Sequence, residues 1–398
     1  GYFVNTTAGA ISVNLPAGTA GAVVGFKDYA NTFDTNAVTL VQNGSDKIGG
    51  STVNATLSVE GLAVTLVFID ATQGWLVTDN GTQDTASTAE YVIATGGTPL
   101  TNGDYKIHVF TGPGTLCVSS AGNAAGSNSV EYLVVGGSGA GGTGETQAAG
   151  GGGAGGFRSF TALPSATPIN SPAALPVSVQ GYGVVVGAGG ASESHLGPIK
   201  PGSLSSFSSI TSAGGGAGRP GSCAVCGSSG TSPVPAMNGG SGGGGTGCAG
   251  PGIGGVGNTP SVSPVQGRDG GDGNLPPSAT GGGGGGAIAE GTNGTTPNIG
   301  GPGGAGAHIP DSFIGPTAPS YGETGPAGRY FAGGGGGNKQ PGGTHGTGGL
   351  GGGGAAGTPN ATAGTINTGG GGGAGWNNCI GSGVGGSGIV IIRYKFQN

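Results

Sequence analysis

The chain has 398 residues, of which only 7 % are charged, and its formal net charge is −6. Its Lys and Arg residues are scattered singly, so it lacks the clustered positive charge that binds phosphates, and we expect no nucleic-acid partner. No apolar run approaches the roughly 18 to 20 residues that a membrane span requires, so we expect no membrane insertion.

The first 80 residues alternate apolar and polar positions at the period of a β-strand. Ile11, Val13 and Leu15 share one face, and the runs around Val38 and Val64 repeat the pattern. This predicts a β-sandwich-like domain over residues 1–80. Residues 81–90 are rich in Thr, Asp and Ser and are expected to form a linker.

A second, small β unit is predicted over residues 91–135, with its last strand at 130–135. The run at 388–396 is also rich in β-branched residues. Both runs adjoin glycine, and together they bracket the whole glycine region. We therefore predict that they are neighbouring strands.

Residues 136–387 are rich in glycine, which comes in blocks rather than at the three-residue period of collagen or the even spread of a flexible linker. A stretch of lower glycine content at 157–213 is predicted to be a β-like insertion. No segment shows helical periodicity with caps, so almost no helix is expected. Such a composition is also typical of disorder, which the strand patterns on both sides oppose. The blocks are Gly150–Gly153, Gly242–Gly245, Gly281–Gly286, Gly333–Gly337, Gly351–Gly354 and Gly369–Gly373.

Polyglycine II is the conformation that best accounts for such blocks. It has three residues per turn, a rise of about 3.1 Å and no internal hydrogen bonds, so each N–H and C=O can pair with a neighbouring chain. The expected fold is therefore all-β with non-regular polyglycine II: β domains at the N-terminal side, followed by a polyglycine II sandwich. Ala154, Ala217 and Ala374 interrupt blocks and are expected on the outer face of a layer.

Several stretches resemble a known class of proteins. Val130–Gly137, Gly150–Arg158 and Gly385–Tyr394 resemble the glycine-rich module of tail-fibre proteins in marine phages, notably those of cyanobacteria. Tyr2–Asn5 and Val24–Asp34 are similar to a β domain repeated in the same fibres. The glycine blocks also resemble the tip adhesins of T-even-type phages, which stack polyglycine II helices and bind receptors with loops at one end. The chain differs from those adhesins in its leading β domains and its long insertion.

The resemblance implies a receptor-binding protein of the distal tail fibre of a virion. It also implies a homotrimer, contacts with other phage tail or fibre proteins, and a receptor that is a bacterial surface glycan or an outer-membrane protein. A structural subunit of a fibre or extracellular filament is the alternative. An ice-binding bundle is disfavoured, because its faces would need regular Thr or Ala and these loops are irregular.

If the blocks form a scaffold, binding residues should lie in the loops. Loop 307–332 combines aromatic side chains with an Arg and carboxylates, which are favoured in binding sites. An alternative interpretation is that its aromatic side chains only cover the scaffold. Its candidate residues are His308, Asp311, Phe313, Tyr321, Glu323, Arg329, Tyr330 and Phe331.

Two further loops and one aromatic residue complete the candidates. The loop from Arg219 to Met237 is the second. The third, 267–274, carries Arg268, Asp269 and Asp272, but two carboxylates are few for calcium, so a solvated turn is favoured and no metal is expected. Trp376 beside a block is either a contact or a plug at the end of a layer.

The sequence contains no convincing catalytic or cofactor motif. Cys223 and Cys226 have the spacing of a zinc or redox motif but no second pair, so a loop with buried or disulfide-linked cysteines is favoured. Glycine-rich phosphate motifs arise by chance in this composition, and no block ends in Lys followed by Ser or Thr. We therefore expect no enzyme and no cofactor. A depolymerase would need carboxylates from separate loops, such as Asp269 with Glu290 or Glu323.

Overall fold

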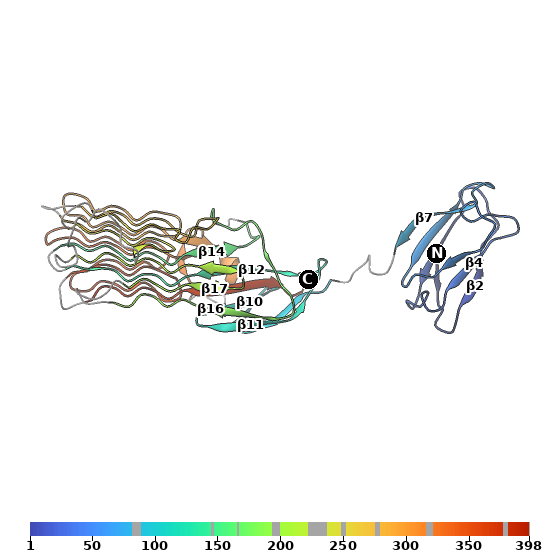
Figure 1. Ribbon diagram of the computed structural model, residues 1–398, viewed down its shortest axis with the longest axis horizontal. Coiled ribbons are helices and arrows are strands. Elements are labelled where there is room, and N and C mark those ends of the chain that lie inside the picture. Colours follow the sequence, from blue (N-terminus) through green and yellow to red (C-terminus); the bar gives the residue numbers. More distant parts are fainter. Residues whose placement is uncertain are drawn as a thin grey trace. The chain divides into compact units, whose positions relative to one another are not determined.

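The computed structural model divides the chain into two compact units, which we call unit 1 (Gly1–Ala89) and unit 2 (Glu90–Asn398) (Figure 1). The structure describes the whole chain except residues 82–88, 145–146, 165–166, 193–199, 222–236, 248–251, 275–278, 316–320, 377–380 and 398. Strands predominate, and the described residues contain one α-helix, α1 (Asp311–Ile314). The expectation of a largely β protein with almost no helix is confirmed.

Unit 1 consists of two sheets that share one core. The first has the strand order β1 (Tyr2–Val4), β3 (Val23–Asp28), β6 (Ala63–Phe68) and β7 (Trp75–Gly81), and the second has the order β2 (Ile11–Asn14), β4 (Val38–Val41) and β5 (Ala55–Leu57). Alternating residues such as Val64, Leu66 and Phe68 point into the core, and Trp75 meets Phe68 edge to face. The period-two pattern therefore places one face of β3, β4 and β6 inside the unit.

Unit 2 contains a central sheet and a second sheet packed on it. The central order is β14 (Phe157–Phe160), β12 (Ser129–Val135), β23 (Ile389–Lys395), β10 (Tyr105–Phe110) and β9 (Thr98–Asn102), with β15 (Leu175–Pro176) also on β12. The second order is β18 (Ile210–Ser212), β17 (Ser205–Phe207), β16 (Gly181–Val185), β11 (Gly114–Ala121) and β8 (Val92–Thr95). The strands that bracket the glycine region, β12 and β23, are antiparallel neighbours from Glu131 opposite Arg393 to Val135 opposite Ile389.

The central sheet is buried on both faces, which explains why β12 and β23 are continuous apolar runs rather than alternating ones. One face packs on the second sheet around Tyr132 and Phe207. The other face packs on α1 and on a third sheet, which has the order β19 (Ala307–Ile309), β21 (Gly328–Phe331) and β20 (Glu323–Gly325). Residues 157–213 supply β14 and β15 to the central sheet and β16, β17 and β18 to the second sheet.

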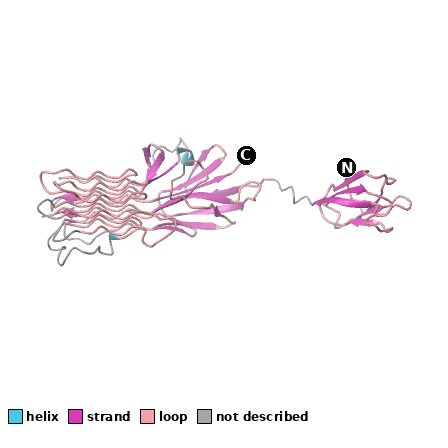
Figure 2. Ribbon diagram, turned by 90° about the horizontal axis from the view of Figure 1, so that it is seen from above, coloured by secondary structure: helices cyan, strands magenta, loops and turns pink. Residues whose placement is uncertain are grey.

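The glycine segments lie side by side and extend from the sheets to the opposite end of unit 2, as Figures 1 and 2 show. We call them the glycine array, and the end away from the sheets the tip. Neighbouring segments pair at every third residue. Segment 136–144, for example, donates from Gly136, Gly139 and Gly142 to the carbonyl oxygens of Gly156, Gly153 and Gly150.

Within the array, consecutive N–H groups donate to different neighbours. The bonds of one block run from Gly150 to the carbonyl of Arg219 (2.9 Å), from Gly151 to Gly282 (3.0 Å), from Gly152 to Gly372 (2.8 Å) and from Gly153 to Gly216 (2.7 Å). The fourth bond returns to the segment that accepted the first. A segment in the middle of the array is therefore surrounded by hydrogen-bonded neighbours, which satisfies backbone groups that would be costly to bury unpaired.

Close packing explains why the inner segments are glycine. A Cβ atom added to Gly152 would overlap the carbonyl oxygen of Gly139, and one added to Gly284 would overlap that of Gly152. Outer segments carry side chains that point to solvent, such as Ile253 and Val256, three residues apart. The position of a segment in the array thus sets which of its residues must be glycine.

The alanines inside the array correct one expectation. The sequence predicts Ala154, Ala217 and Ala374 on an outer face, but all three are buried. Ala374 packs with Ala149 and Ala356, and Ala154 belongs to the core beneath the central sheet. At Ala374 and Ala154 a methyl group is accommodated because it packs against other methyl groups or core side chains.

Candidate functional site

The tip is formed by short turns between array segments. The block Gly333–Gly337 begins directly after β21, beside the sheets, so Asn338 and Lys339 lie at the other end. Turn 295–299 is bonded to turn 339–345, and Thr358 reaches His345. We call residues 295–299, 339–345 and 358–360, together with Gln147, the tip surface.

Asn298 joins two turns of the tip surface. Its Nδ2 donates to the carbonyl oxygens of Gln340 (2.9 Å) and Pro341 (3.1 Å), and its Oδ1 accepts the backbone N–H of Gln340 (3.0 Å). The amide therefore satisfies three backbone groups of the neighbouring turn. This arrangement fixes the two turns relative to each other.

Further side chains extend the connection. Gln340 Nε2 donates to Gln147 Oε1 (3.4 Å), and the hydroxyl of Thr358 lies 3.2 Å from His345 Nε2. Burial, with a smaller effect from the charge of Lys339, lowers the pKa of His345, which favours the neutral imidazole. The tip surface is thus held by neutral hydrogen bonds.

Asn338 anchors the turns to the array beneath them. It is fully buried, its Oδ1 accepts the N–H of Ala149 (2.6 Å), and its Nδ2 donates to the carbonyl of Gly375 (2.5 Å). Asn338, Asn298 and Gln340 are not among the candidates predicted from the sequence. For Asn338 the sequence contains one signal, an Asn directly after a glycine block. At the end of a block, a side-chain amide can form hydrogen bonds with the backbone groups of neighbouring segments.

The first candidate loop does not lie at the tip. It forms the third sheet and α1, next to the central sheet, and Phe313 and Phe331 are fully buried in the core. Tyr321 packs partly against the same core, while Arg329 forms an ion pair with Asp311 at 3.2 Å. In this structure Phe313 and Phe331 therefore offer no surface to a receptor, because the apolar face of the central sheet needs them as cover.

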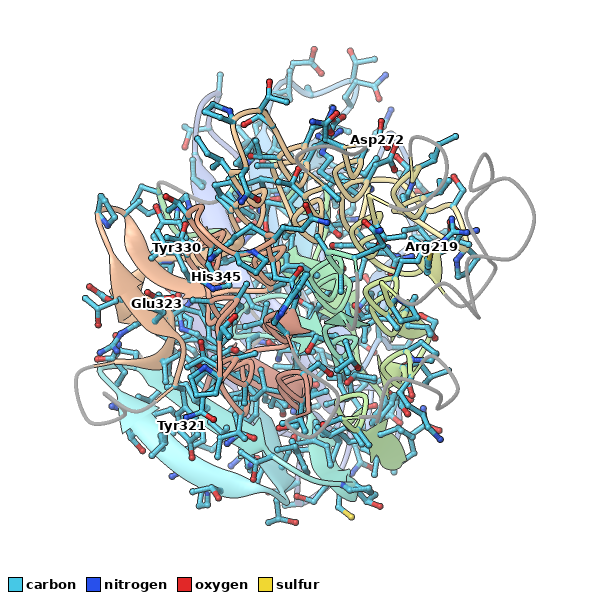
Figure 3. The ribbon with its side chains drawn as sticks, turned by 90° about the vertical axis from the view of Figure 1, so that its left-hand side faces the viewer. Arg219, Asp272, Tyr321, Glu323, Tyr330 and His345 are labelled. Atoms are coloured by element: carbon cyan, nitrogen blue, oxygen red, sulfur yellow. The ribbon has the colours of Figure 1, made fainter. Side chains whose placement is uncertain are left out.

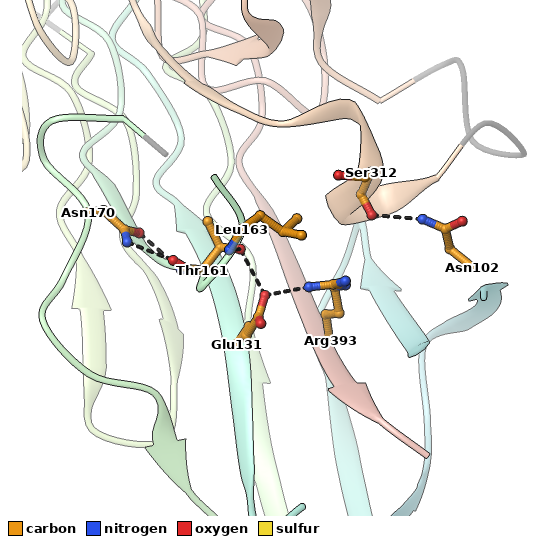
Figure 4. Close-up of polar contacts among 7 residues, drawn as sticks. All are labelled: Asn102, Glu131, Thr161, Leu163, Asn170, Ser312 and Arg393. Atoms are coloured by element: carbon orange, nitrogen blue, oxygen red, sulfur yellow. Dashed lines mark hydrogen bonds and ion pairs between the residues drawn. The ribbon is translucent and has the colours of Figure 1, made fainter. Parts of the chain in front are cut away.

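Figure 4 shows how this module is attached to the central sheet. Asn102 Nδ2, at the end of β9, donates to the carbonyl of Ser312 at 2.7 Å. The guanidinium of Arg393 lies 5.7 Å from the centre of the Phe313 ring. Helix α1 is therefore fixed to β9 by a hydrogen bond and to β23 by a cation–π contact.

Three other candidates from the same loop share the outer face of the third sheet. His308 lies opposite Tyr330, which lies opposite Glu323, so the three form one cross-strand row. We call them the lateral row. Tyr330 and Glu323 lie at one side of the molecule in Figure 3, in which the tip faces the viewer. Their exposure follows from strand alternation, since Ile309 and Phe331 occupy the inner face.

The second candidate loop is described only at its ends. Arg219 belongs to the array through its backbone, and burial lowers the pKa of its largely buried guanidinium. Met237 is fully buried. The residues between them, 222–236, lie outside the described part of the chain, as do Cys223, Cys226, Cys248 and Cys379. Cys117 on β11 is a free, exposed thiol.

The carboxylates of the third loop cap the backbone of an adjacent segment. Asp269 Oδ1 accepts the N–H of Gly257 (2.7 Å), and Asp272 Oδ1 accepts that of Gly254 (2.9 Å). The two carboxylates are three residues apart in the chain, and so are the two N–H groups that they accept. Bonds between paired segments of the array have the same spacing. Arg268, directly before Asp269, exposes its side chain while its backbone pairs in the array.

Trp376, the last of the candidates, lies beside a glycine block. Trp376 lies in β22 (Gly375–Trp376), which pairs with β13 (Thr143–Gly144), and its side chain is half-buried. Among the described residues, no group of three or more His, Cys, Asp or Glu is placed to hold a metal ion. No helix in the described part of the chain is long and apolar enough to cross a membrane.

The sheets, the array and its turns define a largely β protein built around a glycine-rich domain. Residues 117–395 match a family described as a glycine-rich domain, and this match covers more than half of the chain. The chain therefore belongs to the glycine-rich domain family. None of the curated proteins compared with the chain matches it.

Proposed function

We propose that the protein is an adhesin of a phage tail fibre and binds a bacterial surface glycan or outer-membrane protein through its tip surface. The observation that carries this proposal is the fixing of the tip turns, since Asn298 alone bonds three backbone groups of a neighbouring turn. A surface that is ordered before binding loses less conformational entropy when it meets its receptor. The resemblance to phage fibre proteins supports the same role.

The proposal includes the setting of the protein. It acts at the distal end of a virion fibre, as a homotrimer joined to other tail or fibre proteins, and it binds without catalysis or a cofactor. These points follow from the resemblance. The lack of a metal-binding cluster among the described residues is compatible with them but does not test them.

We also propose that the array segments adopt polyglycine II. Three consecutive backbone N–H groups donate to three different neighbouring segments, and the fourth donates to the first of these segments again. This repeat matches a helix of three residues per turn. None of the glycines in the blocks 150–153, 242–245, 281–286 and 333–337 has a positive φ. This agrees with the negative φ, about −75°, of the polyproline II conformation. Such an array supplies a rigid base on which turns can vary.

A structural subunit of a fibre or filament is the second candidate. The observation that favours it is the apolar pair Ile253 and Val256, which are 37 % and 46 % exposed on an outer segment of the array. An exposed apolar stripe can serve lateral association. In that case the turns would serve assembly rather than receptor binding.

Binding of the fluorescently labelled full chain to a panel of cyanobacterial strains tests the proposal. The double variant Asn298→Ala with Gln340→Ala should lose binding to any strain that the native chain labels. Gln180→Ala, an exposed glutamine near the sheets, is the matched control and should bind normally. Failure to label any strain, or equal loss in the control, would contradict the proposal. Sedimentable polymers formed without cells would favour the filament.

A further inference from the structure

We infer that the lateral row is a second binding site and takes a neutral saccharide. His308, Tyr330 and Glu323 stand side by side on three paired strands of the third sheet. The row crosses two strand spacings, roughly 10 Å, which is comparable to the length of a disaccharide. The third sheet packs on the central sheet, at the end of the array away from the tip surface, so this inference does not depend on the proposed function of the tip.

The two rings of the row form one aromatic platform. The ring centroids of His308 and Tyr330 are 5.3 Å apart and the planes are tilted by 39°. Both side chains are half-buried, and a Cβ on Gly325 would press against the Tyr330 ring. Glycine at this position therefore lets the Tyr330 ring lie against the hairpin backbone.

The inner face of the same sheet already supplies the packing that the core needs. Ile309 and Phe331, on the alternate positions of β19 and β21, are almost completely buried against the central sheet. The outer rings are therefore not required to close that core. A half-exposed aromatic pair on a small sheet is more readily explained by a ligand that covers it.

Glu323 adds a fixed hydrogen-bond acceptor beside the rings. Its Oε2 accepts the N–H groups of Gly351 (2.7 Å) and Gly352 (2.8 Å), while the residue itself is exposed. Two backbone donors on one oxygen set the direction of the carboxylate and leave Oε1 for a ligand. A carboxylate that accepts a hydroxyl proton forms a charge-assisted hydrogen bond, which is stronger than a neutral one.

The combination defines the ligand class. The C–H face of a pyranose ring can stack on the aromatic platform while one of its hydroxyl groups donates to Glu323. An acidic sugar is disfavoured, because it would meet the carboxylate of Glu323, and the nearby Arg329 is engaged by Asp311 at 3.2 Å. A neutral hexose disaccharide therefore fits the length, the rings and the charge of the lateral row.

Titration of the full chain with maltose, cellobiose and lactose, followed by saturation-transfer NMR, tests this inference. At least one of the three should bind, and Tyr330→Ala should weaken that binding by about tenfold. Tyr330→Phe keeps the ring and should bind within about twofold of the native chain, because the stacking is retained. Glu323→Gln should weaken binding, and Tyr29→Ala, an exposed tyrosine of unit 1, should not.

The outcomes separate this site from the tip. The Asn298→Ala and Gln340→Ala variant should keep saccharide binding whether or not it loses cell binding. The inference is overturned if none of the three sugars binds, or if binding survives Tyr330→Ala with the fold intact by circular dichroism. It is also overturned if the tip variant loses saccharide binding while Tyr330→Ala keeps it.

Discussion

Glu131 and Arg393 lie opposite each other on β12 and β23, and Arg393 Nη1 is 2.7 Å from Glu131 Oε2. The two side chains are only 12 % and 3 % exposed. Thr161 Oγ1 donates to the same carboxylate oxygen at 2.8 Å, and the guanidinium lies 3.5 Å from the centre of the Tyr105 ring. The strand that leads into the glycine array is thus tied to the strand that leads out of it.

Removing one partner of this pair should destabilise unit 2. Glu131→Gln leaves the guanidinium of Arg393 buried without its counter-charge, which typically costs about 3 to 5 kcal/mol. Denaturant unfolding of the full chain, followed by a probe in unit 2, measures the loss. The paired change Glu131→Leu with Arg393→Met should cost much less, and an equal loss in both variants would contradict a role for the charge itself.

Alanine should not replace glycine inside the array. In Gly284→Ala the new methyl group would overlap the carbonyl oxygen of Gly152, and overpacking of this kind typically costs about 1 to 3 kcal/mol. Gly183→Ala is the matched control, since a Cβ at this exposed strand position meets nothing within 4 Å. Thermal unfolding compares the two. Equal melting temperatures for both variants would show that the array tolerates side chains and is not closely packed.

His108 should make unit 2 less stable in mild acid. Burial is the main cause that lowers its pKa from the usual 6.5, although a hydrogen bond to the Gly96 carbonyl opposes it and Lys106 adds to it. Its Nε2 lies 3.0 Å from the Tyr394 hydroxyl. Because the folded state binds the proton less readily than the unfolded chain, this stabilising contribution is present above pH 6.5 and is lost as the pH falls below it.

The variant His108→Gln tests this pH dependence. The decline of unfolding free energy between neutral pH and pH 5 should be shallower in the variant than in the native chain. His345, whose pKa is also lowered by burial, should account for part of the remaining slope, and His345→Gln should reveal it. An unchanged pH profile in His108→Gln would contradict the assignment.

The carboxylates of Asp269 and Asp272 should act as caps rather than as a cation site. Asn keeps an acceptor oxygen for Gly257 and Gly254, so Asp269→Asn with Asp272→Asn should remain nearly as stable as the native chain. The double Ala variant leaves two backbone donors unpaired, at about 1 to 3 kcal/mol each where they are buried. Stabilisation of the native chain by calcium, abolished in the Asn variant, would instead favour a cation site.

Much of the fold follows from local sequence patterns. The apolar runs that end at Val135 and begin at Ile389 adjoin glycine on both sides of the array, and their pairing could be expected because it brings the two ends of that region together. The glycine of Gly281–Gly286 likewise indicates an inner segment. In each case the segment is surrounded by other segments, and this shows in its residues: apolar side chains in the buried strands and glycine in the closely packed array.

The candidate site was harder to predict. Phe313 and Tyr330 are both aromatic and lie in the same loop, yet Phe313 is fully buried and Tyr330 is half-exposed. Helix α1 packs Phe313 into the core of the central sheet, whereas strand alternation on β21 places Tyr330 on the outer face of the third sheet. Asn298 is an ordinary turn residue in the sequence. Its role depends on the turn at Gln340, which the array brings beside it from far along the chain.

The most direct test of the central claim is hydrogen exchange of the full chain with and without an envelope preparation from a strain that it binds. If the tip surface is the receptor-binding site, peptides covering 295–299 and 339–345 should exchange more slowly in the complex, while peptides of unit 1 should not change. Slower exchange confined to Gly1–Ala89, with the tip peptides unaffected, would contradict the account.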